Sequence, residues 1–165
     1  MKKLLALAVV ILGFTAVSFG QVSDIATASA TIVGPIAITK TADLNFGNLA
    51  VNTNAGTAVI TADAAQTVST TGGVTKVAGV PPTNAQFTVT GVAGYGFTIS
   101  VPASVVLNSG ANNMTLTLAS TPSSPSILTG GTATIYVGGS LAVGASQPSG
   151  TYKNTTDLKV TVNYN

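Results

Sequence analysis

The stretch FTVTGVAGYGFTISV, residues 87–101, decides the fold class of this chain. Phe87 and Val89 alternate with threonines, and after a glycine-rich break Phe97 and Ile99 alternate with Thr and Ser in the same way. A period of two places every second side chain on the same face, which is the pattern of a half-buried β-strand. The stretch therefore predicts two short strands with apolar side chains on one face.

Similar alternation extends in both directions from this stretch. About ten short strands at close spacing are typical of an antiparallel sandwich or barrel. No window of twelve residues combines helical spacing of apolar residues with few Gly or Pro, so we expect no helix. Gly72-Gly73 predicts a hairpin turn. The other predicted strands are residues 24–33, 36–39, 44–47, 57–61, 66–71, 74–78, 114–118, 133–137, 140–143 and 158–164.

The inward faces of these strands predict the core of a single domain, residues 21–165. A chain of this length is one ordinary domain and can bury most of its unfolded surface without disulfides. The predicted fold class is all-β, a single antiparallel sandwich. Its predicted core consists of Phe46, Phe87, Val89, Phe97, Ile99, Leu116, Leu118, Val160 and Val162.

Residues 1–20 have the features of a secretory signal peptide. Two lysines precede an apolar run from Leu4 to Val17, and small residues follow it up to Gly20. The run is too short for a membrane-spanning helix, and the small residues provide a cleavage site before Gln21. We therefore expect export through the inner membrane to the periplasm, cell surface or medium, with no stable membrane span after cleavage.

The chain carries very few charged side chains. Six lysines and four aspartates are the only ones, and Arg, Glu and His are absent. Removal of residues 1–20 would leave four of each, so the mature chain would have no net charge. Such a surface has no basic footprint for nucleic acid, and it repels copies of itself only weakly. We therefore expect no nucleic-acid partner, and self-association is not discouraged.

This composition is poor in the groups that catalyse reactions. The absence of His and Cys removes the commonest general base, thiol nucleophiles and the usual metal ligands. Asp24, Asp43, Asp63 and Asp157 fall in strand or turn settings, where solvated or turn-forming acids are common. We expect no catalytic, cofactor-binding or metal-ligating residue and no cofactor, and we interpret the chain as a non-enzyme.

Two local arrangements have specific structural interpretations. A self-formed isopeptide bond would require Lys40, Asp43 and Asn163 to meet, but surface positions are the favoured interpretation for all three. Tyr152 follows Gly150 just before the last predicted strand. Its hydroxyl either bonds to upstream backbone, as in the tyrosine corner of immunoglobulin-like sandwiches, or lies at the rim.

Several segments together resemble a known family. In chain order they are Pro35-Ile36-Ala37-Ile38, Ala42-Asp43-Leu44-Asn45-Phe46-Gly47, Phe87 to Gly91, Phe97 to Pro102, Leu141 to Ala145, and Gly150-Thr151-Tyr152 leading to Val160-Thr161-Val162-Asn163-Tyr164. They are similar to the uncharacterised bacterial secreted family DUF4402, and the resemblance covers essentially all of residues 21–165. It implies a secreted protein whose role is not established.

A more distant resemblance implies more about mechanism. The element from Leu44 to Gly47 and the ending from Gly150 to Tyr164 are similar to spore coat protein U-like domains, which include major subunits of archaic chaperone–usher pili. Such pilins are immunoglobulin-like sandwiches that lack one strand, and each receives it from the N-terminus of the next subunit. The resemblance implies a pilin-like sandwich, although the cysteines that many of those pilins carry are missing here.

The segment most relevant to that mechanism is residues 24–33. Ala26, Ala28 and Ala30 alternate with hydroxyl side chains, and Ile32 is the one large residue on the apolar face. Small side chains fit either a first strand paired within its own domain or a strand donated to a second copy. The favoured expectation is pairing within its own domain.

The function expected from these observations is that of a secreted, non-enzymatic structural or adhesive surface protein, such as a pilin-like or fimbria-associated subunit. Its expected partners are copies of itself or other surface-assembly subunits. The alternative is an extracellular ligand- or carbohydrate-binding sandwich. Sugar sites favour exposed aromatic side chains, and only Tyr95, Tyr136, Tyr152 and Tyr164 offer a polar one, so ordinary packing of these tyrosines is the simpler interpretation.

Overall fold

A computed structural model describes residues 20–165 of the chain. Residues 1–19, with all but the last residue of the predicted signal peptide, lie outside the described residues. The chain divides after Ile32, and Val33–Asn165 form one compact unit. Within residues 20–165, no helix is both long and apolar enough to cross a bilayer.

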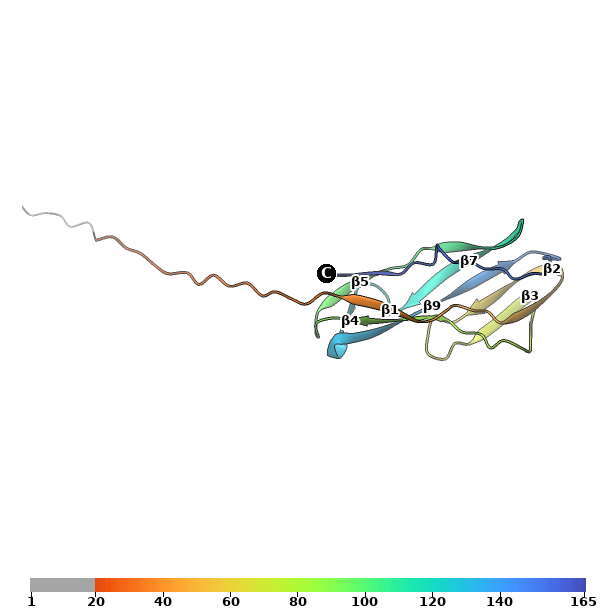
Figure 1. The fold of residues 1–165 in the computed structure, drawn as a ribbon, viewed down its shortest axis with the longest axis horizontal. Coiled ribbons are helices and arrows are strands. Elements are labelled where there is room, and N and C mark those ends of the chain that lie inside the picture. Colours follow the sequence, from red (N-terminus) through yellow and green to blue (C-terminus); the bar gives the residue numbers. More distant parts are fainter. Residues whose placement is uncertain (1–19) are drawn as a thin grey trace, which may run out of the picture. The chain divides into compact units, whose positions relative to one another are not determined.

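The unit Val33–Asn165 is built from antiparallel strands, as the alternating sequence predicts (Figure 1). All strand pairs are antiparallel, and the only helical element in this unit is a short 3-10 turn, Thr129–Gly131. The strands are β1 (Ala37–Ala42), β2 (Asn48–Ile60), β3 (Val68–Val77), β4 (Ala85–Thr90), β5 (Gly96–Ser100), β6 (Ser104–Ser109), β7 (Asn112–Thr121), β8 (Ser126–Ile127), β9 (Thr132–Val143) and β10 (Thr161–Tyr164).

These strands form two sheets, so the predicted all-β sandwich is confirmed. The larger sheet has the order β1-β4-β9-β2-β3, and β7 joins it to β6 by pairing with β9. The smaller sheet has the order β10-β5-β8. Strand β6 was not predicted, because Ser104–Ser109 contains three adjacent apolar residues, Val105, Val106 and Leu107, and so does not show a period of two.

Strand β9 corrects the prediction of two separate strands, 133–137 and 140–143. Gly138-Gly139 does not break β9 but lies where its neighbour changes from β4 to β2. A Cβ atom on Gly138 would lie 2.3 Å from the Ile60 carbonyl oxygen, and one on Gly139 would lie 2.2 Å from that of Thr117. The two glycines therefore allow close approach of neighbouring backbones.

The predicted hairpin at Gly72-Gly73 is also wrong. Both glycines lie inside β3, opposite an irregularity of β2 between Val51 and Gly56. Gly72 has a φ of 65°, which glycine adopts without strain. A Cβ atom on Gly73 would collide with the Asn54 carbonyl oxygen at 1.9 Å. The glycines thus accommodate a bulge in a long pair of strands, and the turn between β2 and β3 lies at residues 61–67.

The core consists of two clusters of buried side chains. The first contains Phe87, Phe97 and Ile135, and the second contains Phe46, Leu116 and others from β2, β6 and β9. All predicted core residues are buried except Leu118, which is half-buried and packs against both clusters. Period-2 alternation therefore identified the inward faces correctly.

Residues 24–33 form no strand, so the prediction of a strand over this range is wrong. Every side chain in this range is exposed, including Ile25 at 94% and Ile32 at 96%. Alanine contributes little apolar area, so this segment gains little from packing unless strand partners are available on both sides.

Candidate interaction groove

Residues 37–51, here called the first edge, pair with other strands along one side only. Strand β1 pairs with β4, Asn45 pairs with Thr83, and Asn48–Val51 pair with Val74–Val77. All these partners belong to a single returning stretch, residues 74–90. The opposite side of the first edge has no strand partner within residues 20–165. Unpaired backbone groups on such a side can accept another strand.

Residues 153–164, here called the last edge, have the same property. Lys153 pairs with Asn108, and Thr161–Tyr164 pair with Phe97–Ser100. These partners lie in one stretch, residues 97–108, and the opposite side of the last edge has no strand partner in the described part of the chain. The first edge (orange to tan) and the last edge (dark blue) both run along the body in Figure 1.

A groove with a volume of 1210 Å³ lies between the part of the first edge from Lys40 to Val51 and residues 147–158, which include only the start of the last edge. Lys40 and residues 43–51 line one wall, and residues 147–155 with Leu158 line the other. Its floor is apolar and is formed by side chains of the larger sheet: Ala85, Phe87, Val105, Leu107, Met114, Leu116, Leu141 and Val143.

Most of the floor belongs to the second core cluster or packs against it, and Ala85 and Phe87 belong to the first. Leu49, Leu107 and Met114 pack against the second cluster but are only half-buried, and so do Leu44 and Leu158. Core side chains in a closed sandwich are covered by strands on both sides. Here the groove leaves the side chains of Leu49, Leu107 and Met114 partly exposed at one side of the second cluster.

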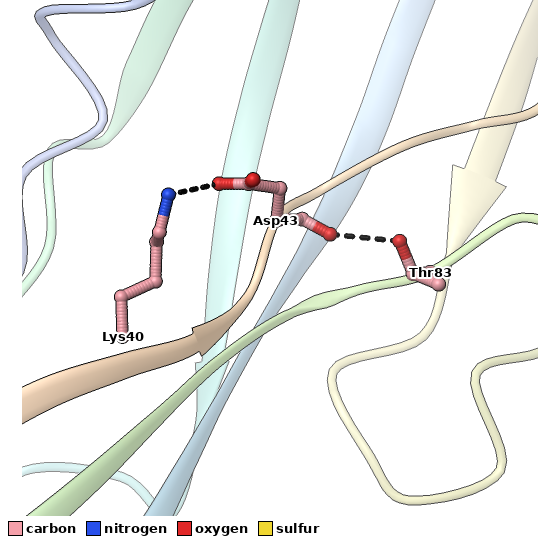
Figure 2. A network of polar contacts seen from close by, with 3 residues as sticks. All are labelled: Lys40, Asp43 and Thr83. Atoms are coloured by element: carbon pink, nitrogen blue, oxygen red, sulfur yellow. Dashed lines mark hydrogen bonds and ion pairs between the residues drawn. The ribbon is translucent and has the colours of Figure 1, made fainter.

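An ion pair lies at the wall formed by the first edge (Figure 2). The Lys40 Nζ donates to Asp43 Oδ1 at 2.5 Å, and the Asp43 carbonyl oxygen accepts a hydrogen bond from Thr83 Oγ1 at 2.7 Å. The two charged side chains are 55% and 78% exposed, so the pair contributes little to stability. It does place the charged groups of both residues in the lining of the groove.

Lys40, Asp43 and Asn163 are all exposed, as expected, and the structure does not assemble an isopeptide site from them. Asn163 lies in β10 opposite Thr98, whose hydroxyl donates to the Asn163 carbonyl oxygen at 3.2 Å. Such a bond would need a buried acid beside the lysine, whereas the Asp43 carboxylate is exposed to solvent. The lysine and the acid act as a surface pair.

Tyr152 organises the opposite wall. Its hydroxyl donates to the Pro148 carbonyl oxygen at 2.8 Å, which is the upstream backbone bond that a tyrosine corner predicts. Gln147 Nε2 donates to the same hydroxyl at 2.9 Å and to the Asn113 carbonyl oxygen at 3.2 Å. These bonds tie the loop before the last edge to β7, and the Ser146 N–H of the same loop donates to the Asn52 carbonyl oxygen at 2.9 Å, next to the end of the first edge.

The carboxylates of Asp63 and Asp157 accept hydrogen bonds from residues close to them in the sequence. A hydrogen bond from the Thr61 hydroxyl, helped by the backbone N–H groups of Gln66 and Ala65, lowers the pKa of Asp63 below its ordinary value of 3.8. Hydrogen bonds from the side chains of Asn154 and Thr156 lower the pKa of Asp157 in the same way. Both carboxylates stay ionised at neutral pH, where they accept hydrogen bonds. Among residues 20–165, no group of three or more acidic side chains could hold a metal ion.

The tyrosines show mostly ordinary packing. Tyr136, Tyr152 and Tyr164 are half-buried, and the Tyr164 hydroxyl accepts a hydrogen bond from the Val92 N–H at 2.8 Å. Tyr95 is 41% exposed and packs edge-on against Tyr164, with ring centroids 5.9 Å apart. One exposed tyrosine that already contacts a neighbouring ring is a weak platform for a sugar.

The fold and the groove define the class of protein: an antiparallel β-sandwich domain with an apolar-floored groove beside its first edge. Residues 36–164 match the family described as Domain of unknown function (DUF4402). The chain therefore belongs to this family, as its sequence motifs suggested. The comparisons found no matching curated protein and no matching solved structure.

Sequence reasoning did not find this groove. The half-buried Leu49, Leu107 and Met114 alternate like ordinary core residues, and nothing in the pattern reveals that no strand covers them. Whether a strand pairs on one side or both depends on which segments meet in space. A signal would have been that the sequence predicts more apolar strand faces than there are strands to cover them. Recognising this requires the complete topology of the domain.

Proposed function

We propose that this protein is an exported, non-enzymatic structural subunit of the bacterial cell surface, which assembles with copies of itself in a pilin-like manner. In this assembly the groove between the first and last edges receives an added β-strand. The added strand is the segment 24–33 of a second copy. Each subunit thereby fills the groove of one neighbour and has its own groove filled by another.

The observation that carries this proposal is the pair of unpartnered edges that face each other across an apolar groove. A strand placed between them can hydrogen bond to both edges while alternate side chains contact the floor. This arrangement would bury the exposed sides of Leu49, Leu107 and Met114. Residues 24–33 supply such alternation and form no strand themselves.

The near absence of charge supports association between copies. Residues 21–165 carry four lysines and four aspartates, so long-range repulsion between subunits is weak. The lowered pKa values of Asp63 and Asp157 keep these two carboxylates ionised near neutral pH, which suits hydrogen bonding within turns rather than proton transfer. Both observations favour a structural role over catalysis.

Deletion of residues 24–33 tests the proposal. In the native host, the intact chain should be recovered as polymers by electron microscopy and size-exclusion chromatography. The deletion variant should be exported and folded but monomeric, because the body Val33–Asn165 keeps all its strands.

A matched control combines Thr27→Ser, Ser29→Thr and Thr31→Ser. These substitutions change only side chains on the hydroxyl face of the segment. This variant should still polymerise, because its apolar face is intact. Polymers formed by the deletion variant, or an intact chain that is monomeric at the surface, would contradict the proposed function.

A further inference from the structure

We infer that Gln21 is a site of covalent modification: once residues 1–20 are removed, its side chain closes onto its own α-amine, and the exported chain begins with a pyroglutamyl ring. This inference rests on the export in the proposed function and adds to it the chemical state of the mature N-terminus. It does not depend on how copies of the chain associate.

The position of Gln21 at the predicted cleavage site is the first observation. Ser18 and Gly20 are the small residues before the cut, and Gln21 is the first residue after it. The glutamine side chain is long enough for its amide carbon to reach its own backbone nitrogen in an unstrained lactam ring. A cut one residue earlier or later would place Gly20 or Val22 at the end, and neither side chain can react in this way. The inferred modification therefore requires the cut before Gln21.

The reaction balances without a second reactant. The α-amine nitrogen attacks the side-chain amide carbon, so that an N–Cδ bond forms and the Cδ–Nε2 bond breaks. Nε2 leaves as ammonia and takes a proton from the α-amine, and nothing is oxidised or reduced. The α-amine of a peptide has an ordinary pKa of about 7.7–8.0, so part of it is uncharged near neutral pH and can act as the nucleophile.

The structure leaves the side chain of Gln21 free to react. Every side chain of residues 20–33 is exposed, and none of these residues belongs to a strand. A Cβ atom added to Gly20 would meet nothing within 4 Å. The Asp24 carboxylate is occupied within the segment, because its Oδ1 accepts a hydrogen bond from the Ile25 N–H at 2.8 Å. An exposed side chain can exchange between rotamers, including those that bring the amide back to the α-amine.

Ring closure changes the charge of the whole chain. Residues 21–165 carry four lysines and four aspartates, so the α-amine and the C-terminal carboxylate also balance. The lactam is uncharged, and its formation leaves one negative charge in excess. Because so few groups titrate, this single charge should lower the isoelectric point by about 1–2 pH units.

Ring closure also protects the N-terminal segment. Aminopeptidases recognise a free α-amine, which the lactam removes. Proteolysis concentrates at chain ends that are not tied down by packing. Residues 24–33, which the proposed function requires intact, begin three residues after Gln21 and form no strand. The ring therefore blocks trimming at the point from which this segment would be lost.

Mass spectrometry of the exported chain, purified from the native host, tests the modification. The undigested protein should be lighter by one ammonia than the sequence 21–165 with a free α-amine. Trypsin cleavage after Lys40 releases residues 21–40, in which Gln21 is the only residue with a side-chain amide. The loss of ammonia should appear in this peptide. Treatment with a pyroglutamyl peptidase should then expose Val22 to N-terminal sequencing.

Gln21→Asn is the matched control, because it keeps the amide but shortens the side chain by one methylene group, so that the corresponding ring would be strained. The variant should keep its free α-amine, its full mass and the higher isoelectric point. Incubation with a broad-specificity aminopeptidase should remove residues from the variant and none from the wild-type chain. The position is exposed, so folding of both proteins should be the same.

The other outcomes separate the inference from the proposed function. A free α-amine on Gln21 in the undigested wild-type chain, or an N-terminus at another residue after cleavage, would overturn the inference and leave strand addition intact. Equal trimming of the wild-type chain and Gln21→Asn would overturn the protective role of the ring. An exported chain that retains residues 1–20, or absence of export, would overturn the proposed function.

Discussion

Individual buried residues determine how well the two halves of the sandwich hold together. Phe97 is 0% exposed and lies in β5, the central strand of the smaller sheet, where it packs in the first core cluster. Asn84 is also 0% exposed, and its Nδ2 donates to the carbonyl oxygens of Thr61 at 2.9 Å and Asp63 at 2.6 Å. One residue supplies apolar contact across the sheets, and the other fixes the turn between β2 and β3.

Replacement of Phe97 by alanine should lower the free energy of unfolding by about 3–5 kcal/mol, because a fully buried ring leaves a cavity. Urea denaturation followed by far-UV circular dichroism measures this change. Ile127→Ala is the matched control, since Ile127 is 61% exposed, and its effect should stay within about 0.5 kcal/mol. Equal effects of the two substitutions would show that Phe97 is not a core residue.

Among the elements, β9 has the largest role in the topology. It pairs with β7 on one side and with β4 and then β2 on the other, so it holds the larger sheet together. The change of partner at Gly138 places β4 and β2 one after the other along the same side of β9. Strand β1 pairs with β4, so this arrangement also sets the position of the first edge.

Gly139→Ala should destabilise the domain by about 1–3 kcal/mol, because the added methyl group has no room beside the Thr117 carbonyl oxygen. Gly34→Ala is the comparison, since its Cβ would lie 3.9 Å from the Val92 side chain, an ordinary contact. Thermal unfolding of both variants measures the difference. A melting temperature for Gly139→Ala as high as that of Gly34→Ala would refute the tight packing of β9 against β7.

The whole domain is an incompletely covered sandwich. Its second core cluster borders the groove and has half-buried side chains packed against it, and Ala85 and Phe87 of the first cluster also line the groove. Burial of apolar area stabilises a folded state by roughly 25 cal/mol per Å². A strand that fills the groove should therefore stabilise the domain as a bound ligand does.

Addition of a synthetic peptide of residues 21–33 to the variant lacking these residues should raise its melting temperature. At a peptide concentration of 100 times Kd the stabilisation is about 2.7 kcal/mol. A control peptide with Ala28→Asp and Ile32→Asp should have little effect, because it places carboxylates on the apolar floor. Differential scanning fluorimetry provides the readout, and equal shifts with both peptides would mean that the groove does not select an apolar face.

The sequence by itself determined the fold class, the inward faces and the family, because these depend on local alternation and on motifs such as that from Leu44 to Gly47. A period of two assigns each side chain to a face without knowledge of its neighbours. Tertiary structure alone decided that Gly72-Gly73 and Gly138-Gly139 lie inside strands, that residues 24–33 form no strand, and that a groove lies beside the first edge. Each of these features depends on which backbone segments, far apart in the sequence, come close together in space. Hydrogen bonding between two such strands produces no periodic pattern in the sequence of either strand.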